Sequence, residues 1–433
     1  MSEQLHLCLT IGLLFLLSMG AQAQESACPV LNQAWQSILA THPSIHAASE
    51  KIKSREASAS SLKATQLPKL DASASYQYTS EVAQFNIPIP AVAAAMPQGS
   101  HNRSELGITA SYAIFTGFAQ TNSIAAATLA THAQTMDFVQ TKNNLALQLG
   151  LLHIALQSAL EDSRVIQERL QVKMEHVKTI ATLKQEGTAT QAQVLSAQAD
   201  VALAAADTAK SSRLVDSLAA EFSNLAGISY PREKMTLCVT QPPIQSSPKS
   251  YLADELETQA QSIEKSSEAA TASQYPMLSA MAGYRYGNPG LQVLGSSWMG
   301  YALAGVQLQW NLFDGFERRS TLTRFSSDAK SMQFEAERLR KNQSTTLHQL
   351  NSERKSLHTE QEALEAGLAA ARSAHDALQA AQVGGTAIAD EIRDSDLRTL
   401  ELESRLILLR YRSASLDLRI AWTRGQDIAF TGE

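Results

Sequence analysis

Two long stretches of the chain carry a heptad-like seam of apolar residues, which is typical of a helix face that packs against another helix. No proline lies in residues 98–230 or in residues 290–433. Because an interior proline costs a helix about 3 kcal/mol, both stretches are free to form very long helices. The seam positions are Leu145, Leu149, Leu152, Leu156, Ala159, Ser163, Ile166 and Leu170, followed in the second stretch by Leu347, Leu350, Leu357, Leu364, Ala371 and Leu378.

We predict one helix over residues 119–186 and a matching helix over 317–383, each about 100 Å long at roughly 1.5 Å per residue. Glycines end both runs, and residues 188–226 and 386–424 are predicted to return as antiparallel partners. Phe, Trp and Tyr make up only 6% of the chain, which is little for a large compact core. An extended wall of paired helices is therefore favoured over an ordinary bundle.

A period of two precedes each predicted hairpin and indicates strands with one apolar and one polar face. We predict strands over about 105–115 and 303–313, with the tyrosine-bearing segments 70–80 and 278–286 as their neighbours. Their apolar positions are Leu106, Ile108, Ala110, Tyr112 and Ile114 in the first half and Val306, Leu308, Trp310 and Leu312 in the second. Either these strands form a half-buried soluble sheet, or they face lipid on one side and water on the other.

Four strands are too few to close a membrane barrel, since the smallest have about eight. Open strand edges are forbidden in lipid because their backbone groups would have no hydrogen-bond partners. If the strands span a membrane, several chains must therefore share one barrel. The physics requires an oligomer without choosing the number of copies.

The chain repeats itself. Ile114-Phe115-Thr116-Gly117-Phe118 is echoed 198 positions later by Leu312-Phe313-Asp314-Gly315-Phe316, and Gly187-Thr188 by Gly385-Thr386 at the same offset. Leu67-Pro68-Lys69-Leu70 returns as Tyr275-Pro276-Met277-Leu278, displaced by 208. We predict two repeats, 24–230 and 251–433, joined by a linker over 231–250. Each repeat contains a helix, two strands and a long helical hairpin.

The N-terminal segment is predicted to be a secretory signal peptide over residues 1–23. An apolar run from Leu7 to Met19 precedes Ala21-Gln22-Ala23, a typical cleavage site. Met1 to His6 contain no Lys or Arg, so a retained anchor is the alternative. The formal net charge of −6 gives no nucleic-acid footprint. Beyond the signal, no apolar stretch approaches the 18 residues of a spanning helix.

These features together resemble the TolC-like outer membrane factor family. The resemblance rests on the Leu-Pro-x-Leu before the first strand, the Phe-x-Gly-Phe at each strand-to-helix junction and the Gly-Thr hairpin tips. Gln193-Val194-Leu195-Ser196-Ala197 is similar to the family's Asp-Val-Leu-x-Ala segment. The resemblance covers essentially all of residues 30–425.

The resemblance implies an α+β membrane protein whose homotrimer forms a twelve-stranded β-barrel in outer-membrane lipid. The barrel continues into a long α-helical periplasmic tunnel with an equatorial region. Such a protein is a passive exit duct of a tripartite efflux pump or type I secretion system, and docks to a periplasmic adaptor and an inner-membrane transporter. The competing interpretation is a periplasmic coiled-coil adaptor without a pore. An enzyme is the weakest alternative, because the chain has no phosphate loop, nucleophile elbow or metal-binding His motif, and we expect no cofactor.

The resemblance also implies where the sites lie. Asp390, Glu391 and Asp394 are predicted to form an acidic ring at the periplasmic entrance, which attracts cations. The alternative is that they are solvated surface charges paired with Arg393 and Arg398. The first repeat has Gln193 and Ser196 at the equivalent positions of Glu391 and Asp394, so only the second repeat supplies acid.

The remaining site predictions concern the tips, the junctions and the cysteines. The tips are the expected adaptor contacts, and their glycines also permit the tight reversal. Trp298, Tyr301 and Trp310 are candidates either for an aromatic girdle at the lipid interface or for core packing. The predicted tip residues are Gly187, Thr188, Gly384, Gly385 and Thr386, the junction residues are Phe115, Gly117, Phe313 and Gly315, and the candidate disulfide is Cys28–Cys238.

Overall fold

The computed structural model describes residues 29–81, 100–230, 248–291, 297–383, 388–428 and 430. The predicted signal peptide, Cys28, Cys238 and the second hairpin tip (Gly384, Gly385 and Thr386) lie outside these residues. The helices are α2 (Pro29–Thr41), α3 (Pro43–Ala64), α4 (Ala119–Gln185), α5 (Gln191–Ala226), α6 (Tyr251–Thr271), the short 3-10 helix η2 (Ala272–Gln274), α7 (Glu317–Val383) and α8 (Ala389–Thr423). The strands are β1 (Lys69–Tyr78), β2 (Asn102–Phe115), β3 (Met277–Asn288) and β4 (Met299–Gln309).

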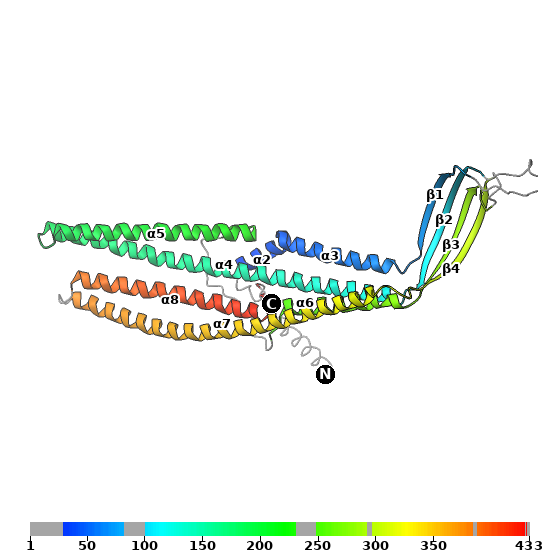
Figure 1. Ribbon diagram of the computed structural model, residues 1–433. Helices are drawn as coiled ribbons and strands as arrows, with labels where there is room; N and C mark the ends of the chain where they lie inside the picture. The colour runs from blue at the N-terminus through cyan, green and yellow to red at the C-terminus, as the bar shows by residue number, and fades with distance from the viewer. Residues whose placement is uncertain are drawn as a thin grey trace, which may run out of the picture. The chain divides into compact units, whose positions relative to one another are not determined.

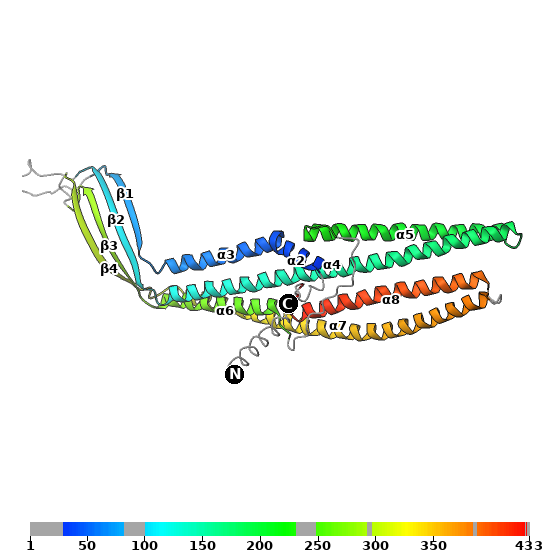
Figure 2. The same cartoon turned by 180° about the vertical axis from the view of Figure 1, so that it is seen from behind.

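The chain forms two compact units, and each draws on both halves of the sequence. One unit comprises residues 1–48, 138–251 and 340–433, and the other comprises 49–137 and 252–339. Helices α4 and α7 contribute residues to both units (Figures 1 and 2). These units are not the two predicted repeats, because each unit combines corresponding parts of both.

The strands form one antiparallel sheet with the order β1-β2-β3-β4, so that β1 and β4 are its edges. The prediction for the fourth strand was wrong at its ends, since β4 begins at Met299 and stops at Gln309. The reason is its neighbour. Strand β3 begins at Met277, which pairs with Gln309, so the residues after Gln309 have no strand beside them. Trp310 instead donates its indole N–H to the carbonyl oxygen of Gln274 at 3.1 Å.

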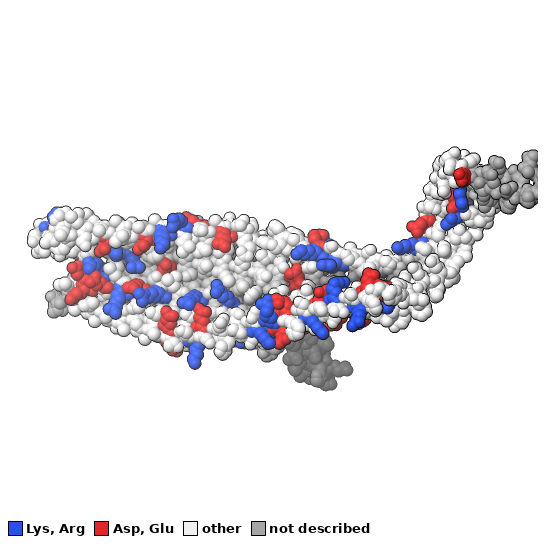
Figure 3. All heavy atoms as spheres, viewed as in Figure 1, with Lys and Arg blue, Asp and Glu red and all other residues white. Residues whose placement is uncertain are grey.

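The two faces of the sheet differ sharply. Alternation along the registered strands puts most of the large apolar side chains on one face, where they remain exposed in the single chain: Leu70, Tyr76, Leu106, Ile108, Tyr112, Tyr284, Tyr286, Val306 and Leu308. The opposite face carries a polar cluster. There the carboxylate of Glu105 accepts hydrogen bonds from Arg285 at 2.9 Å and from the hydroxyl of Tyr301 at 3.1 Å. Few charged side chains are visible over the sheet in Figure 3.

Both strand-to-helix junctions adopt the same backbone conformation. Gly117 and Phe118 have φ values of 62° and 69°, and Gly315 and Phe316 have values of 62° and 70°. Each pair of left-handed residues turns the chain from a strand into a long helix. The flanking rings pack edge to face, with centroids 5.6 Å apart for Phe115–Phe118 and 5.9 Å apart for Phe313–Phe316. The repeated sequence motif therefore encodes a repeated turn.

The main core lies in the unit that contains the helical hairpins. It joins α2, α4, α5, α8 and the C-terminal segment, with Ile38, Leu149, Leu156, Phe222 and Phe430 almost fully buried. The predicted seam from Leu145 to Ser163 is buried, and the smaller cluster between α7 and α8 contains Leu347 and Leu357. Among the described residues, no helix is both long and apolar enough to cross a membrane.

Candidate functional site

The first hairpin tip is a tight turn whose geometry requires glycine. Gly187 has φ of 78°, a conformation that costs other residues about 1–2 kcal/mol. The amide and the hydroxyl of Thr188 both donate to the carbonyl oxygen of Leu183 at 2.9 Å. Thr190 then caps α5, because its hydroxyl accepts from the amide of Gln193 at 3.3 Å and its own amide donates to the Gln193 side chain at 2.8 Å. The turn at the tip is thus held by hydrogen bonds from its own backbone and side chains.

The start of α8 holds the three acidic residues predicted at the entrance. The carboxylate of Glu391 accepts a hydrogen bond from the backbone amide of Ile388 at 3.3 Å. A carboxylate in the first turn of a helix is favoured by the helix dipole. Glu391 therefore has a local role in ending the tip and beginning the helix.

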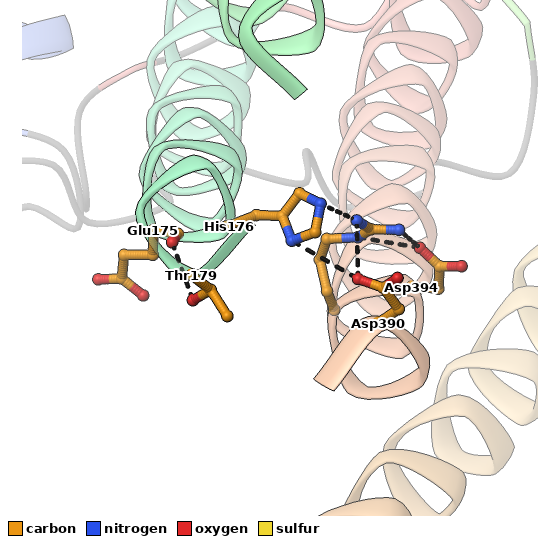
Figure 4. Close-up of polar contacts among 6 residues, drawn as sticks. Glu175, His176, Thr179, Asp390 and Asp394 are labelled. Carbon is orange, nitrogen blue, oxygen red and sulfur yellow. Dashed lines mark hydrogen bonds and ion pairs between the residues drawn. The ribbon is translucent and has the colours of Figure 1, made fainter. Parts of the chain in front are cut away.

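Asp390 and Asp394 belong to a cluster that joins α8 to α4. Arg393 forms ion pairs with Asp390 at 3.3 Å and with Asp394 at 2.7 Å. The same guanidinium contacts Nε2 of His176 on α4, while Nδ1 of His176 lies 3.7 Å from the carboxylate of Asp390. Figure 4 shows the His176 ring directed at the two aspartates, and Glu175 directed away. We call His176, Asp390, Arg393 and Asp394 the α4–α8 cluster.

His176 is mostly enclosed, with 12% of its side chain exposed. Burial and the neighbouring Arg393 lower the pKa of His176, while Asp390, Asp200 and Asp394 act in the opposite direction. The net direction favours the neutral imidazole, which is the form that accepts a hydrogen bond from Arg393. The cluster is therefore arranged around an uncharged histidine.

Asp390 and Asp394 are both paired with Arg393, so an acidic ring at the entrance would not consist of free carboxylates. With His176 neutral, Arg393 balances one of the two aspartate charges, so the cluster keeps one net negative charge. Pairing with Arg393 is what the alternative interpretation named, whereas Arg398 makes no ion pair with an acidic side chain of the described residues. The ring itself stays a prediction. His176 was not predicted, because it lies 217 positions before Arg393 and belongs to no local motif.

Further polar contacts continue between α4 and the rest of this unit. The hydroxyl of Ser404 donates to Asp162, and the indole of Trp422 donates to Asn144 at 3.2 Å. His153 is buried beside Tyr230, with Nδ1 of the ring 3.3 Å from the hydroxyl oxygen. Burial lowers the pKa of His153 to about 4 and raises that of Tyr230 to about 12. Both side chains are thus uncharged at neutral pH.

The structure brings together only some of the other predicted residues. Trp298 stacks on Tyr286 with centroids 5.1 Å apart, at the end of the sheet opposite the junctions, whereas Trp310 lies at the junction end. Tyr301 is engaged with Glu105 on the polar face. No group of three or more metal-ligating side chains occurs within the described ranges.

Residues 34–227 match the family model of outer membrane efflux proteins, a stretch that runs from α2 to the end of α5. No curated protein sequence matches the chain. Solved structures with the same fold include the outer membrane protein VceC of Vibrio cholerae (18% identity, TM-score 0.73, covering 92% of this chain and 97% of VceC). They also include the outer membrane channels MtrE of Neisseria gonorrhoeae (15%, 0.75, 94% and 91%) and CmeC of Campylobacter jejuni (14%, 0.73, 92% and 86%).

The four-stranded meander and the two long helical hairpins define the chain as one protomer with the fold of the outer-membrane channels. The family match agrees with this fold. Residues 34–227 thus match the outer membrane efflux proteins and the chain has the fold of the outer-membrane channels, in agreement with the resemblance drawn from its repeated motifs. The family is described as efflux proteins, which does not support the enzyme alternative.

Proposed function

We propose that three copies of this chain form a passive channel in the outer membrane that extends into the periplasm. The channel is the exit duct of a tripartite efflux pump or type I secretion system, and it docks to a periplasmic adaptor and an inner-membrane transporter. The observation that carries the proposal is the sheet, which has an exposed apolar face, a polar opposite face and two unpaired edges.

The strand order supports closure by further copies of the chain. Because the sheet is a strict meander, β4 of one copy beside β1 of the next gives another antiparallel pair. Twelve strands from three copies exceed the minimum of about eight for a membrane barrel. The apolar face then meets lipid and the polar face lines the lumen.

The internal repeat supports a matching contact at the base of the sheet. Gly117 packs against Ala272 and Tyr275, and an added Cβ would lie 2.7 Å from the carbonyl oxygen of Ala272. Its counterpart Gly315 has nothing within 4 Å of that position. The residues equivalent to Ala272 and Tyr275, 208 positions earlier, are Ala64 and Leu67. We propose that Ala64 and Leu67 of the neighbouring copy cover Gly315.

The internal repeat also predicts a contact between the long helices of neighbouring copies. Helix α8 packs on α4 within the chain through Arg393 and His176. Their repeat equivalents, α5 and α7, are predicted to pack together between neighbouring copies. Leu195 and Leu203 stand 198 positions before Arg393 and Glu401, and both are exposed in the single chain. A neighbouring α7 would cover them and close a tunnel of helices.

The experiment that tests this function is a planar-bilayer recording on detergent-purified protein. We expect cation-selective conductance that divalent ions block, and we expect the block to weaken in the double variant Glu391→Ala/Asp394→Ala. Conductance and block unchanged by the substitutions would retain the channel and remove the acidic entrance. A soluble monomer without conductance would contradict the channel itself.

A further inference from the structure

A groove of about 480 Å³ lies between α4 and α8, beside the α4–α8 cluster. Arg169 lines it from α4, and Asp394, Arg398, Glu401 and Arg405 line it from α8. Three of these five charged side chains are arginines. We call this hollow the basic groove.

The acids of the basic groove are already paired. Asp394 is held by Arg393 at 2.7 Å, and Glu401 is held by Arg405 at 2.7 Å. Arg169 and Arg398 form no ion pair with any acidic residue that the structure describes, and Nε of Arg169 is buried without a hydrogen-bond acceptor among them. An unmet guanidinium donor is costly, and a carboxylate satisfies it best because the two groups match in geometry. The groove thus presents two arginines, on two different helices, that lack an anion.

The internal repeat supplies a comparison within the same molecule. At the repeat-equivalent positions, 198 residues away, Arg398 and Arg405 are replaced by Asp200 and Asp207 on α5, and Arg169 is replaced by Gly367. Asp200 and Asp207 are both exposed. The two repeats therefore share the same helical hairpin but carry opposite charges at these equivalent positions.

We propose that the basic groove binds a carboxylate-bearing segment of the periplasmic partner protein, with Arg169 and Arg398 as its main contacts. The proposal rests on the proposed function, which supplies the partner. Each chain holds one such groove, and the equivalent α5 surface repels the same segment. A carboxylate bound by both arginines joins α4 to α8, so docking stiffens the wall beside the entrance.

The test is fluorescence anisotropy with a labelled hexaglutamate peptide and detergent-purified, full-length protein. We expect saturable binding of one peptide per chain that weakens at higher salt. Arg398→Gln and Arg169→Gln should each weaken binding about tenfold or more, the loss expected for one charge-assisted hydrogen bond. Arg398→Lys should retain part of the affinity. The matched control Arg419→Gln removes the same charge from an exposed position on α8 outside the groove, and should change the affinity less than about twofold.

Three results would overturn the proposal. The first is an equal loss with Arg419→Gln, which would mean diffuse charge attraction. The second is no loss with Arg169→Gln and Arg398→Gln when size-exclusion profiles show folded oligomers. The third is displacement of the peptide by citrate at equal carboxylate concentration, which would mean a site for small anions. Bilayer conductance of the same preparations separates the two proposals, since a conducting protein without peptide binding fails only this one.

Discussion

A single methyl group at Gly315 tests whether neighbouring copies meet at the base of the sheet. Gly117 and Gly315 have the same φ of 62°, so alanine at either position costs about 1–2 kcal/mol for the left-handed conformation. At Gly117 the new Cβ also lies 2.7 Å from a backbone oxygen of the same chain. Overpacking of this kind typically adds about 1–3 kcal/mol. At Gly315 a single chain has open space within 4 Å, and no such clash arises.

In the proposed trimer, Gly315→Ala would carry a steric cost that it does not have in a single chain. If Ala64 of the next copy packs on Gly315 as Ala272 packs on Gly117, then Gly315→Ala introduces the clash at three interfaces of a trimer. The expected loss is about 3–9 kcal/mol of assembly free energy, beside about 1–2 kcal/mol per chain of conformational strain. Gly117→Ala should instead destabilise each chain whether or not it is assembled.

The assay is the temperature at which the purified oligomer dissociates in detergent, read by size exclusion, with circular dichroism as the measure of folding. Gly187→Ala is the matched control, because Gly187 also has a positive φ (78°) and nothing within 4 Å of an added Cβ, but lies at the hairpin tip rather than at the base of the sheet. Gly315→Ala should dissociate well below the control while keeping its helix content. Equal dissociation temperatures for Gly315→Ala and Gly187→Ala would refute the proposed contact.

Three further outcomes are expected. The pKa of His176 is lowered in the folded protein, so its contribution to the α4–α8 contact is present above the unfolded value of about 6.5 and is lost as pH falls below it. The protection factor for hydrogen exchange at the start of α8, which corrects for the slower intrinsic exchange at lower pH, should fall between pH 7 and 5, and His176→Gln should remove that fall. Leu149→Ala opens a cavity at a fully buried position and should cost about 2–5 kcal/mol in urea unfolding, whereas the more exposed Met174→Ala should cost far less. Intact mass after alkylation with and without reduction should show one Cys28–Cys238 disulfide, and two alkylated thiols without reduction would exclude it.

The lengths of the helices were predictable because their limits are local. Absence of proline permits the runs, and glycine at each tip ends the first helix of the hairpin, so α4 and α7 lie within one residue of the predicted bounds. The end of β4 was not predictable in this way. The end of β4 is set by the position at which its neighbour β3 begins. The period-two pattern in the sequence continues past Gln309 to Leu312, and nothing in that pattern indicates where β3 begins.

The candidate site also contains residues that local sequence could predict and residues whose contacts depend on the fold. The sequence located Asp390 and Asp394 near a hairpin tip and offered Arg393 as a partner, since a spacing of three on a helix puts side chains together. It gave no sign of His176, because that contact depends on which face of α4 meets α8. The buried pair of His153 and Tyr230 was equally hidden. The partner of a polar residue on an otherwise apolar seam cannot be predicted from the sequence, because the fold determines which residues lie beside it.

The pairing of β2 with β3 has a consequence for how the protein is made. This ladder joins Ser104 to Asn288, so the two central strands come from halves that are synthesised one after the other. While only the first half exists, β2 has β1 on one side and an open edge on the other, with the apolar face uncovered. Such edges readily pair with other chains. We therefore expect the first half to need protection until the second arrives, and folding to be limited by that long-range closure rather than by the fast formation of the helices.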